Sequence, residues 1–362
     1  MKTTISIHKK PSKTMKKQLT IGIDVGGTNT VLGLIDRDGN CIARTDFHTQ
    51  RSTNEDGPVF FDEYMELLYG AIEQLLAQVP EDGKVEGIGI GAPNANYYKG
   101  AILNAANLTW KDRNKPSKEV MGEFEKQNRC EVVKLLKKRF PAIKAIAMTN
   151  DANAAALGEL YYGGGKSLKR KDLVEITLGT GLGSGFVSNG DIIYGHNSFA
   201  GELGHIIVEP GGRNCGCGNN GCLETYASAT GIRRTALNLI DNTGTPSVLR
   251  KIDRDKLTAK DVSIAAANGD RLALEVWDIT GHYLALGIST AVVVTCPEAV
   301  FLFGGPTKAG DLLMNPLKKY LDKYMLAAMK DTKVMFSRLG EDAAILGASA
   351  LALNAIAAIN RK

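Results

Sequence analysis

The sequence predicts an α/β fold built from two related domains that face each other across a cleft. Three observations indicate this. Apolar segments with strand and helix periodicity alternate along the chain. A unit of strand, glycine–threonine turn and strand occurs twice, about 155 residues apart. The 362 residues are 44% hydrophobic and 23% charged, which is enough apolar content for two full cores.

The first half of the chain shows one such unit followed by a helix and a further strand. Residues 19–25 form an apolar strand that runs into the turn Gly26–Asn29, and a second strand follows over 31–35. Apolar residues at helical spacing predict a helix over 60–79, and residues 85–90 read as another strand.

The second half repeats the pattern. Residues 173–178 form a strand, the glycine-rich segment 179–185 turns the chain, and a strand resumes at 186–187. Another strand over 299–303 ends at Gly304 and Gly305. Helices are predicted over 151–161, 272–294, 312–325 and 342–359, a charged, largely helical surface stretch over 111–139, and a flexible surface loop over 163–167.

These elements suggest a domain division. We expect a disordered basic tail over 1–18, a small α/β domain over 19–149 joined by the C-terminal helix 342–362, and a large α/β domain over 150–341.

The net charge of +5 comes from the start of the chain. Residues 1–17 hold six lysines and no acid, and without them 38 basic residues face 39 acidic ones. The tail is either a basic arm or an upstream extension whose natural start is Met15. We therefore expect no nucleic-acid partner. A signal peptide core and a membrane span are not expected either, so the protein is expected to be cytoplasmic.

Two glycine turns are candidate phosphate sites. Paired glycines at Gly26 and Gly27 let backbone N–H groups approach an anion, and Thr28 adds a hydroxyl. Asp24 at the strand end could hold a hydrated Mg²⁺. The alternative is a hairpin that only needs glycine for its backbone shape. The recurrence of this chemistry at 179–185 favours phosphate, whereas neither a Walker loop nor a G-x-G-x-x-G helix start is present.

Three cysteines within eight residues indicate a metal site. Cys215, Cys217 and Cys222 lie on a glycine-rich loop, and His205 precedes them by ten residues. A Cys₃His set is a common closed tetrahedral zinc site, so we expect structural Zn²⁺ and no open catalytic position.

The same residues carry a family resemblance. Residues 201–205 (GELGH) and 215–224 (CGCGNNGCLE) resemble the signature of the ROK family of bacterial sugar kinases and sugar-responsive repressors. Residues 24–28 look like its first phosphate motif and 150–155 (NDANAA) like its catalytic segment. The similarity extends over residues 19–353 and is greatest to the glucokinase group.

The resemblance implies two actin-like, hexokinase-type (ribonuclease H-like) domains that close on a sugar and ATP, expected as a homodimer. By position, Asp151 would be the catalytic base, and His205 would bind both zinc and sugar. The implied sugar-binding residues are Asn150, Asp151, Glu202, His205 and Glu224. The implied ATP-binding residues are Asp24, Gly26, Gly27, Thr28, Asn29, Gly179, Thr180, Gly181, Gly304 and Gly305.

The sequence allows two interpretations of Asp151. At the start of a predicted helix it could be a helix cap, the ordinary use of Asn-Asp at such a position. The resemblance favours a base, and the helix dipole would support its ionised form. Two features depart from the family pattern: Asn94 stands where the family usually has glycine, and the 111–139 stretch is longer than usual. Both bear on which hexose is used.

The combined expectation is an ATP-dependent hexokinase that phosphorylates the 6-hydroxyl of glucose. Alternatives are a kinase for N-acetylmannosamine, N-acetylglucosamine or fructose, a sugar-sensing repressor, or a sugar-binding module without catalysis. The repressor is disfavoured because only 18 residues precede the first strand, too few for a helix-turn-helix domain.

Overall fold

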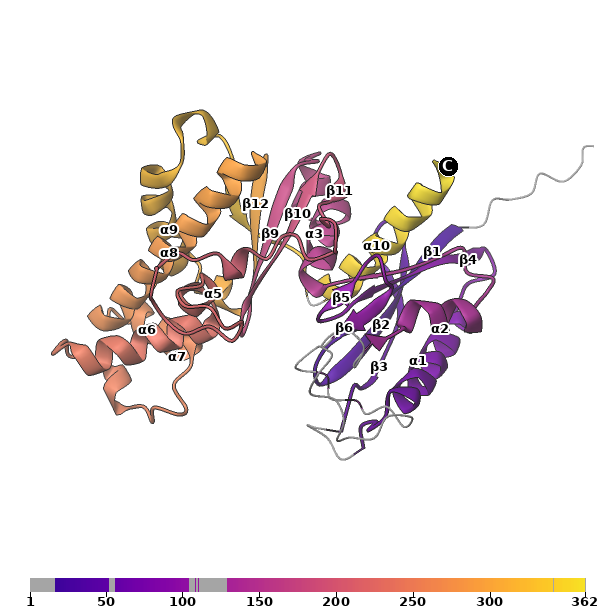
Figure 1. Cartoon of the computed structure of the whole chain (residues 1–362), viewed down its shortest axis with the longest axis horizontal. Coiled ribbons are helices and arrows are strands. Elements are labelled where there is room, and N and C mark those ends of the chain that lie inside the picture. Colours follow the sequence, from indigo (N-terminus) through magenta and orange to yellow (C-terminus); the bar gives the residue numbers. More distant parts are fainter. Residues whose placement is uncertain are drawn as a thin grey trace, which may run out of the picture.

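The computed structural model describes residues 17–51, 56–103, 108, 110, 129–340 and 342–361. Two α/β halves lie side by side, with helices α3 and α10 between them (Figure 1). The predicted tail lies outside the described residues up to position 16. Lys17 and Gln18 differ from the prediction, because they already belong to the first strand, where Lys17 forms an ion pair of 2.8 Å with Asp82.

The first half is organised around a five-stranded sheet. Its strand order is β3-β2-β1-β4-β8, with β1, β2 and β3 antiparallel and β4 and β8 parallel to β1. The strands are β1 (Lys17–Val25), β2 (Asn29–Asp36), β3 (Cys41–His48), β4 (Gly83–Gly91) and β8 (Ala145–Thr149). A small second sheet holds β5 (Ala95–Asn96), β6 (Ala101–Leu103) and β7 (Arg129–Cys130).

The second half repeats this architecture. Its sheet has the order β11-β10-β9-β12-β13, with the same succession of antiparallel and parallel pairs. The strands are β9 (Leu173–Leu178), β10 (Leu182–Ser188), β11 (Asp191–Ile192), β12 (Ala299–Gly304) and β13 (Lys333–Phe336). The shared order confirms the prediction of two related domains. The expectation that residues 179–185 only connect strands is wrong, since β10 begins at Leu182.

The helices predicted over 60–79, 151–161, 272–294, 312–325 and 342–359 are confirmed to within about three residues, whereas α5, α6 and α7 were not predicted. The predicted loop 163–167 is instead a helical turn, α4, and the described part of the 111–139 stretch forms β7 and α2. The helices are α1 (Phe61–Leu76), α2 (Val132–Arg139), α3 (Asp151–Tyr161), α4 (Gly164–Ser167), α5 (Glu224–Ala227), α6 (Ala229–Asn242), α7 (Ala259–Ala267), α8 (Arg271–Thr295), α9 (Asp311–Tyr324) and α10 (Ala343–Asn360).

Helix α10 packs directly on the first sheet. A Cβ atom added to Gly22 of β1 or Gly89 of β4 would overlap the α10 backbone, so glycine at both positions lets the helix approach closely. Of the helices that the structure describes, α10 alone is long and apolar enough to cross a membrane. Its buried residues include Ile345, Ala348 and Leu351, so its apolar character is that of a core helix.

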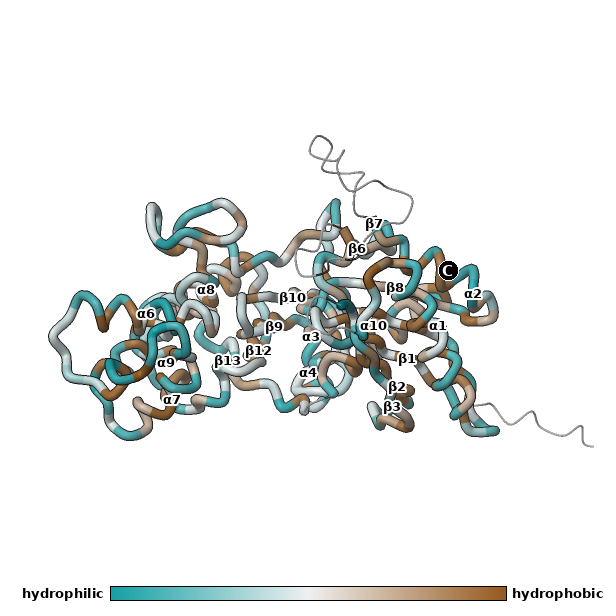
Figure 2. Tube along the Cα trace, turned by 90° about the horizontal axis from the view of Figure 1, so that it is seen from below, coloured by the Kyte–Doolittle hydropathy of each residue, from teal (hydrophilic) through white to brown (hydrophobic). Residues whose placement is uncertain are grey.

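Each half has its own hydrophobic core. The first core joins β1, β2 and β4 to α1, and the second joins β9 and β12 to α6, α8 and α9. Hydrophobic stretches accordingly coincide with the central strands of both sheets in Figure 2.

Two glutamates are buried beside the turn between α3 and α4: Glu159 in α3 and Glu175 in β9. Glu159 and Glu175 are 0% and 1% exposed, and one oxygen of each has no hydrogen-bond partner among the described residues. The other Glu159 oxygen accepts the Gly164 N–H at 3.0 Å. Burial, with a further contribution from Glu159, raises the pKa of Glu175 well above its usual value.

This pair predicts stability that declines as the pH rises above about 4.5. An acid whose pKa is raised by folding stabilises the protein fully below its unfolded pKa, near 4.5, and loses that contribution as the pH rises toward the folded value. In Glu175→Gln, the loss of unfolding free energy between pH 5 and pH 8 should shrink by at least about 1.4 kcal/mol, the equivalent of one pKa unit. Urea unfolding at both pH values measures this, with exposed Glu66→Gln as the matched control. Identical pH dependence in Glu175→Gln and wild type would contradict the assignment.

Candidate functional site

The two equivalent glycine turns meet at one cavity of about 610 Å³. The β1–β2 turn contributes one wall and the β9–β10 turn another, and the end of β12 and the start of α10 complete it. The sequence names fifteen residues as ATP- or sugar-binding, and ten of them line this cavity. Those that line it are Asp24, Gly26, Gly27, Asp151, Gly179, Thr180, Gly181, Glu224, Gly304 and Gly305.

Close approach to the cavity explains the glycines at 179 and 305, whereas at Gly26 an added Cβ would meet the Asn29 carbonyl oxygen of the same turn at 2.9 Å. Neither Gly26 nor Gly179 has a positive φ, so the alternative that these turns need glycine for that reason is not supported. An added Cβ at Gly305 would meet no atom within 4 Å, and at Gly179 only the Gly181 carbonyl oxygen at 4.0 Å. The space beside both residues opens into the cavity, where a ligand can contact their backbone N–H groups.

The charges of the lining suit a phosphate–cation pair. The lining contains the carboxylates of Asp24, Asp151 and Glu224 and no lysine, arginine or histidine. Ala343 and Ala344 at the N-terminus of the 18-residue α10 also line it, which places the positive end of the helix dipole at the cavity. Phosphates beside these acids would need a bound cation to offset the repulsion.

Asp24 fits a magnesium site. Burial, followed by the charge of Asp151, raises the pKa of Asp24 to about 6. A carboxylate that lacks a protein cation is stabilised by a divalent ion, and carboxylates, phosphates and water are the ligands that Mg²⁺ prefers. The donor set therefore fits Mg²⁺ held between Asp24 and a phosphate.

A second, smaller cavity of about 180 Å³ adjoins the first and shares Asp151, Pro93 and Gly183 with it. Its polar lining comes from both halves of the chain. The lining residues are Pro93, Asn94, Ala95, Asn150, Asp151, Ala152, Gly183, Ser184, Ser198, Phe199 and Glu202. The volume is below the roughly 300–1,000 Å³ of pockets for drug-sized ligands, so one small polar molecule is a suitable occupant.

Asp151 lies between the two cavities at the first residue of α3. The cap of α3 is its neighbour Asn150, whose Oδ1 accepts the Asn153 N–H at 2.8 Å. Asp151 Oδ1 accepts the adjacent Ala152 N–H at 2.9 Å. Burial raises the pKa of Asp151, and the backbone N–H groups oppose this in part. The carboxylate is thus available to a ligand.

Three of the residues named from the sequence line neither cavity. Thr28 accepts the Thr49 N–H through its carbonyl oxygen at 2.8 Å, and the Asn29 side chain contacts His48 at 2.9 Å. His205 faces the cysteine cluster instead. Conversely, Ser198 and Phe199 of the smaller cavity were not named, since nothing in their local pattern distinguishes them from an ordinary loop.

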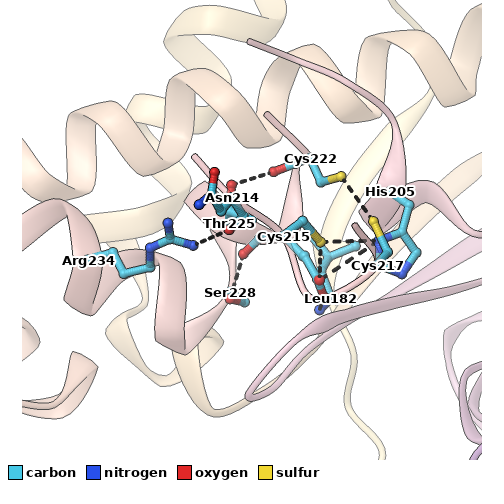
Figure 3. A network of polar contacts seen from close by, with 10 residues as sticks. Leu182, His205, Asn214, Cys215, Cys217, Cys222, Thr225, Ser228 and Arg234 are labelled. Carbon is cyan, nitrogen blue, oxygen red and sulfur yellow. Dashed lines mark hydrogen bonds and ion pairs between the residues drawn. The ribbon is translucent and has the colours of Figure 1, made fainter. Parts of the chain in front are cut away.

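The cysteine cluster has the geometry of a zinc site. One ligand atom from each of His205, Cys215, Cys217 and Cys222 lies within 4.8 Å of all the others. The Cys217 and Cys222 sulfurs are 3.6 Å apart, and Cys215 Sγ is 3.7 Å from His205 Nδ1 (Figure 3). In a tetrahedron with zinc–sulfur bonds near 2.3 Å, ligand atoms lie about 3.8 Å apart, so the residues fit structural zinc.

Glu224 connects this cluster to the larger cavity. Its Oε1 accepts from Cys215 Sγ at 2.9 Å and lies 3.8 Å from His205 Nδ1, while its Oε2 accepts the Leu182 N–H at 3.4 Å. Glu202 lies in the smaller cavity, where burial raises its pKa, and His205 opposes the shift. The segment from Glu202 to Glu224, which holds the cysteine cluster, therefore positions one carboxylate in each cavity.

Comparison with known proteins agrees with this architecture. Residues 20–355 match the ROK family. A glucokinase from Halalkalibacterium halodurans is 35% identical over 339 residues, which cover 92% of this chain and 94% of that protein. A glucokinase from Thermotoga maritima is 32% identical, over 93% and 98% of the two chains.

The chain is also similar to solved structures of ROK family proteins. A ROK family glucokinase from Streptomyces griseus in complex with glucose and AMPPNP is 28% identical with a TM-score of 0.68, over 93% of this chain and 99% of that one. A ROK family transcriptional regulator, a homologue of the E. coli MLC protein, is 26% identical with a TM-score of 0.75, over 92% and 78%. The chain belongs to the ROK family.

Proposed function

We propose that this protein is an ATP-dependent sugar kinase that transfers the γ-phosphoryl group to the 6-hydroxyl of glucose. The observation that carries the proposal is the position of Asp151, between a cavity walled by two glycine turns and a small polar cavity. Its solved relative from Streptomyces griseus binds glucose and AMPPNP together. We further propose that the enzyme acts in the cytoplasm as a homodimer.

The proposed mechanism uses the two cavities for the two substrates. ATP occupies the larger cavity, with its phosphates against the backbone of the turns at Gly26 and Gly179. The sugar occupies the smaller cavity, and its 6-hydroxyl faces the γ-phosphorus next to Asp151. As the hydroxyl oxygen attacks in line, Asp151 accepts its proton and ADP leaves. When bound at Asp24, Mg²⁺ would offset negative charge on the phosphates.

The remaining residues of the site orient the sugar. Asn150 uses its Oδ1 for the helix cap, which leaves its amide NH₂ to donate to a sugar oxygen. Glu202 would accept hydrogen bonds from sugar hydroxyls inside the smaller cavity, and Glu224, which lines the larger cavity, would do so where the two cavities adjoin. We propose that His205 binds zinc through Nδ1, the atom that faces Cys215, and contacts the sugar through Nε2.

The proposal is tested by measuring ADP release across a panel of sugars. With the purified protein and MgATP, glucose should give the highest kcat/KM among glucose, fructose, mannose, N-acetylglucosamine and N-acetylmannosamine. Phosphorus NMR of the product should identify glucose 6-phosphate. A higher kcat/KM for an N-acetylated sugar or for fructose would replace glucose as the substrate, and no sugar-dependent ADP release would refute the kinase proposal.

A further inference from the structure

Two segments beside the smaller cavity, one from each domain, are joined directly to each other. They are residues 94–98, which include β5, and the loop 194–199 after β11. The Asn96 side-chain NH₂ donates to the Asn197 carbonyl at 2.8 Å, and the Tyr97 N–H donates to Ser198 Oγ at 2.8 Å. Asn96 and Ser198 are only 2% and 3% exposed, so these bonds pair polar groups that would otherwise be buried alone.

An aromatic contact reinforces the junction. The rings of Tyr97 and Tyr194 are stacked, with centroids 4.0 Å apart and planes 10° apart. Tyr98 packs edge-on against Tyr194 at 6.1 Å, and its hydroxyl donates to the Gly195 carbonyl at 2.9 Å. Stacked and edge-to-face aromatic pairs add stability beyond the area that they bury.

The junction holds unusual backbone conformations at the cavity itself. Asn94 has φ of 52° and Ser198 has φ of 72°, in the left-handed region that residues other than glycine rarely adopt. Both residues line the smaller cavity, as does Phe199. Such conformations persist where surrounding contacts fix them: Ser198 is bonded across the junction to Tyr97, and the Asn94 carbonyl accepts the Leu103 N–H within the first domain.

We propose that segments 94–98 and 194–199 form an interdomain clasp that sets which sugar the smaller cavity accepts. This inference rests on the proposed kinase function. Asn96, Tyr97 and Tyr194 are positioning residues, and they act through the cavity walls made by Asn94, Ser198 and Phe199. The cavity of about 180 Å³ lies between the two tied segments, so its fit to the substituents of a hexose depends on the junction that holds them together.

The clasp can be weakened at Tyr194, which lines neither cavity, and at Ser198, which lines the smaller one. Tyr194→Leu removes the stacking partner of Tyr97, whereas Tyr194→Phe keeps the ring and should behave like wild type. Ser198→Ala removes the acceptor of the Tyr97 N–H. Tyr320→Leu is the matched control, because Tyr320 also stacks on a tyrosine, Tyr324, but lines neither cavity.

Two measurements test the clasp. Hydrogen–deuterium exchange without ligand should show faster exchange at the Tyr97 amide in Ser198→Ala and Tyr194→Leu than in wild type and the control. In kinetics, both variants should raise the KM for glucose by about tenfold and leave the KM for ATP within about twofold. The ratio of kcat/KM for glucose to that for N-acetylglucosamine should fall.

The outcomes separate this inference from the proposed function. Unchanged exchange at Tyr97, or faster exchange with unchanged glucose KM and selectivity, would overturn the clasp while leaving the kinase proposal intact. If the wild type transfers phosphate to no sugar, the function fails, and the clasp is then judged by calorimetric sugar binding in the same variants. Equal sugar affinity in the wild type and the variants would then overturn the clasp proposal.

Discussion

Replacing Asp151 with asparagine should lower kcat by at least about a hundredfold and change sugar affinity much less. A hydroxyl must lose its proton as it attacks phosphorus, and a positioned base typically contributes about 10²–10⁴-fold to such a step. That corresponds to roughly 2.7–5.4 kcal/mol of transition-state stabilisation. Asparagine keeps the shape and can still form a hydrogen bond with the sugar, but it cannot accept the proton.

A purely structural role for Asp151 predicts a different result. Asn150 already caps α3, and asparagine is as good a residue as aspartate at a helix start, so Asp151→Asn should then be nearly silent. Asp270→Asn is the matched control, since Asp270 is the cap of α8 and accepts the Ala273 N–H at 3.0 Å. Steady-state kinetics and calorimetric sugar binding distinguish the roles. If Asp151→Asn retains more than about a tenth of wild-type kcat, Asp151 is not the base.

The sequence could predict those parts of the site whose signal is local. The strand–turn–strand units around Gly26 and Gly179 each lie within about 20 residues, and the cysteines lie within eight. The repeat of the glycine turn also predicted two related domains that face each other. The matching strand orders confirm that they are related, and both turns line the same cavity.

Strands without an apolar signature were missed. In β3, exposed and half-buried residues alternate along an edge of the first sheet, and polar residues such as Arg44 and Asp46 occupy half of it. In β10, the glycines at 183 and 185 suggested a turn. Their role is packing, because a Cβ at Gly185 would meet Ala156 and the backbone of α3. Only the tertiary contact with α3 reveals this.

Contacts between distant segments could likewise not be predicted from local sequence patterns. Tyr97 and Tyr194 are 97 residues apart and come from different domains, so neither one indicates the other in the sequence. The same limit applies to Glu159 and Glu175, which would each be taken for surface residues until α3 and β9 bury them together. Thr28 is a further case: it follows Gly27 but does not itself line the cavity, and its role in ATP binding stays a prediction.

Replacing Cys217 with serine should release zinc and lower stability and sugar affinity together. Removing one thiolate leaves an incomplete tetrahedral set, and at structural sites the free energy of metal binding is part of the free energy of folding. A ligand present at 100–1,000 times its Kd stabilises a protein by about 2.7–4.1 kcal/mol. For a domain of this size, that corresponds to a fall in Tm of about 5–15 °C.

The effect on sugar follows from the position of the cluster. Cys215 contacts both His205 and Glu224, and Glu224 also accepts the Leu182 N–H at the second glycine turn. A loose loop would therefore misplace two proposed sugar ligands at once, whereas the first glycine turn, on the other domain, would stay intact. We expect the KM for glucose to rise by more than the KM for ATP.

Cys296→Ser is the matched control, because Cys296 is an exposed cysteine at the end of α8 and lies outside the cluster. Elemental analysis should find one zinc per chain in wild type and in Cys296→Ser, and well below one in Cys217→Ser. Thermal unfolding and glucose kinetics are then measured on the same preparations. Full activity in wild-type protein that carries well under one zinc per chain would show that the loop holds its shape without the metal. The cysteines would then be three packed thiols, and the positions of His205 and Glu224 would depend on the surrounding backbone alone.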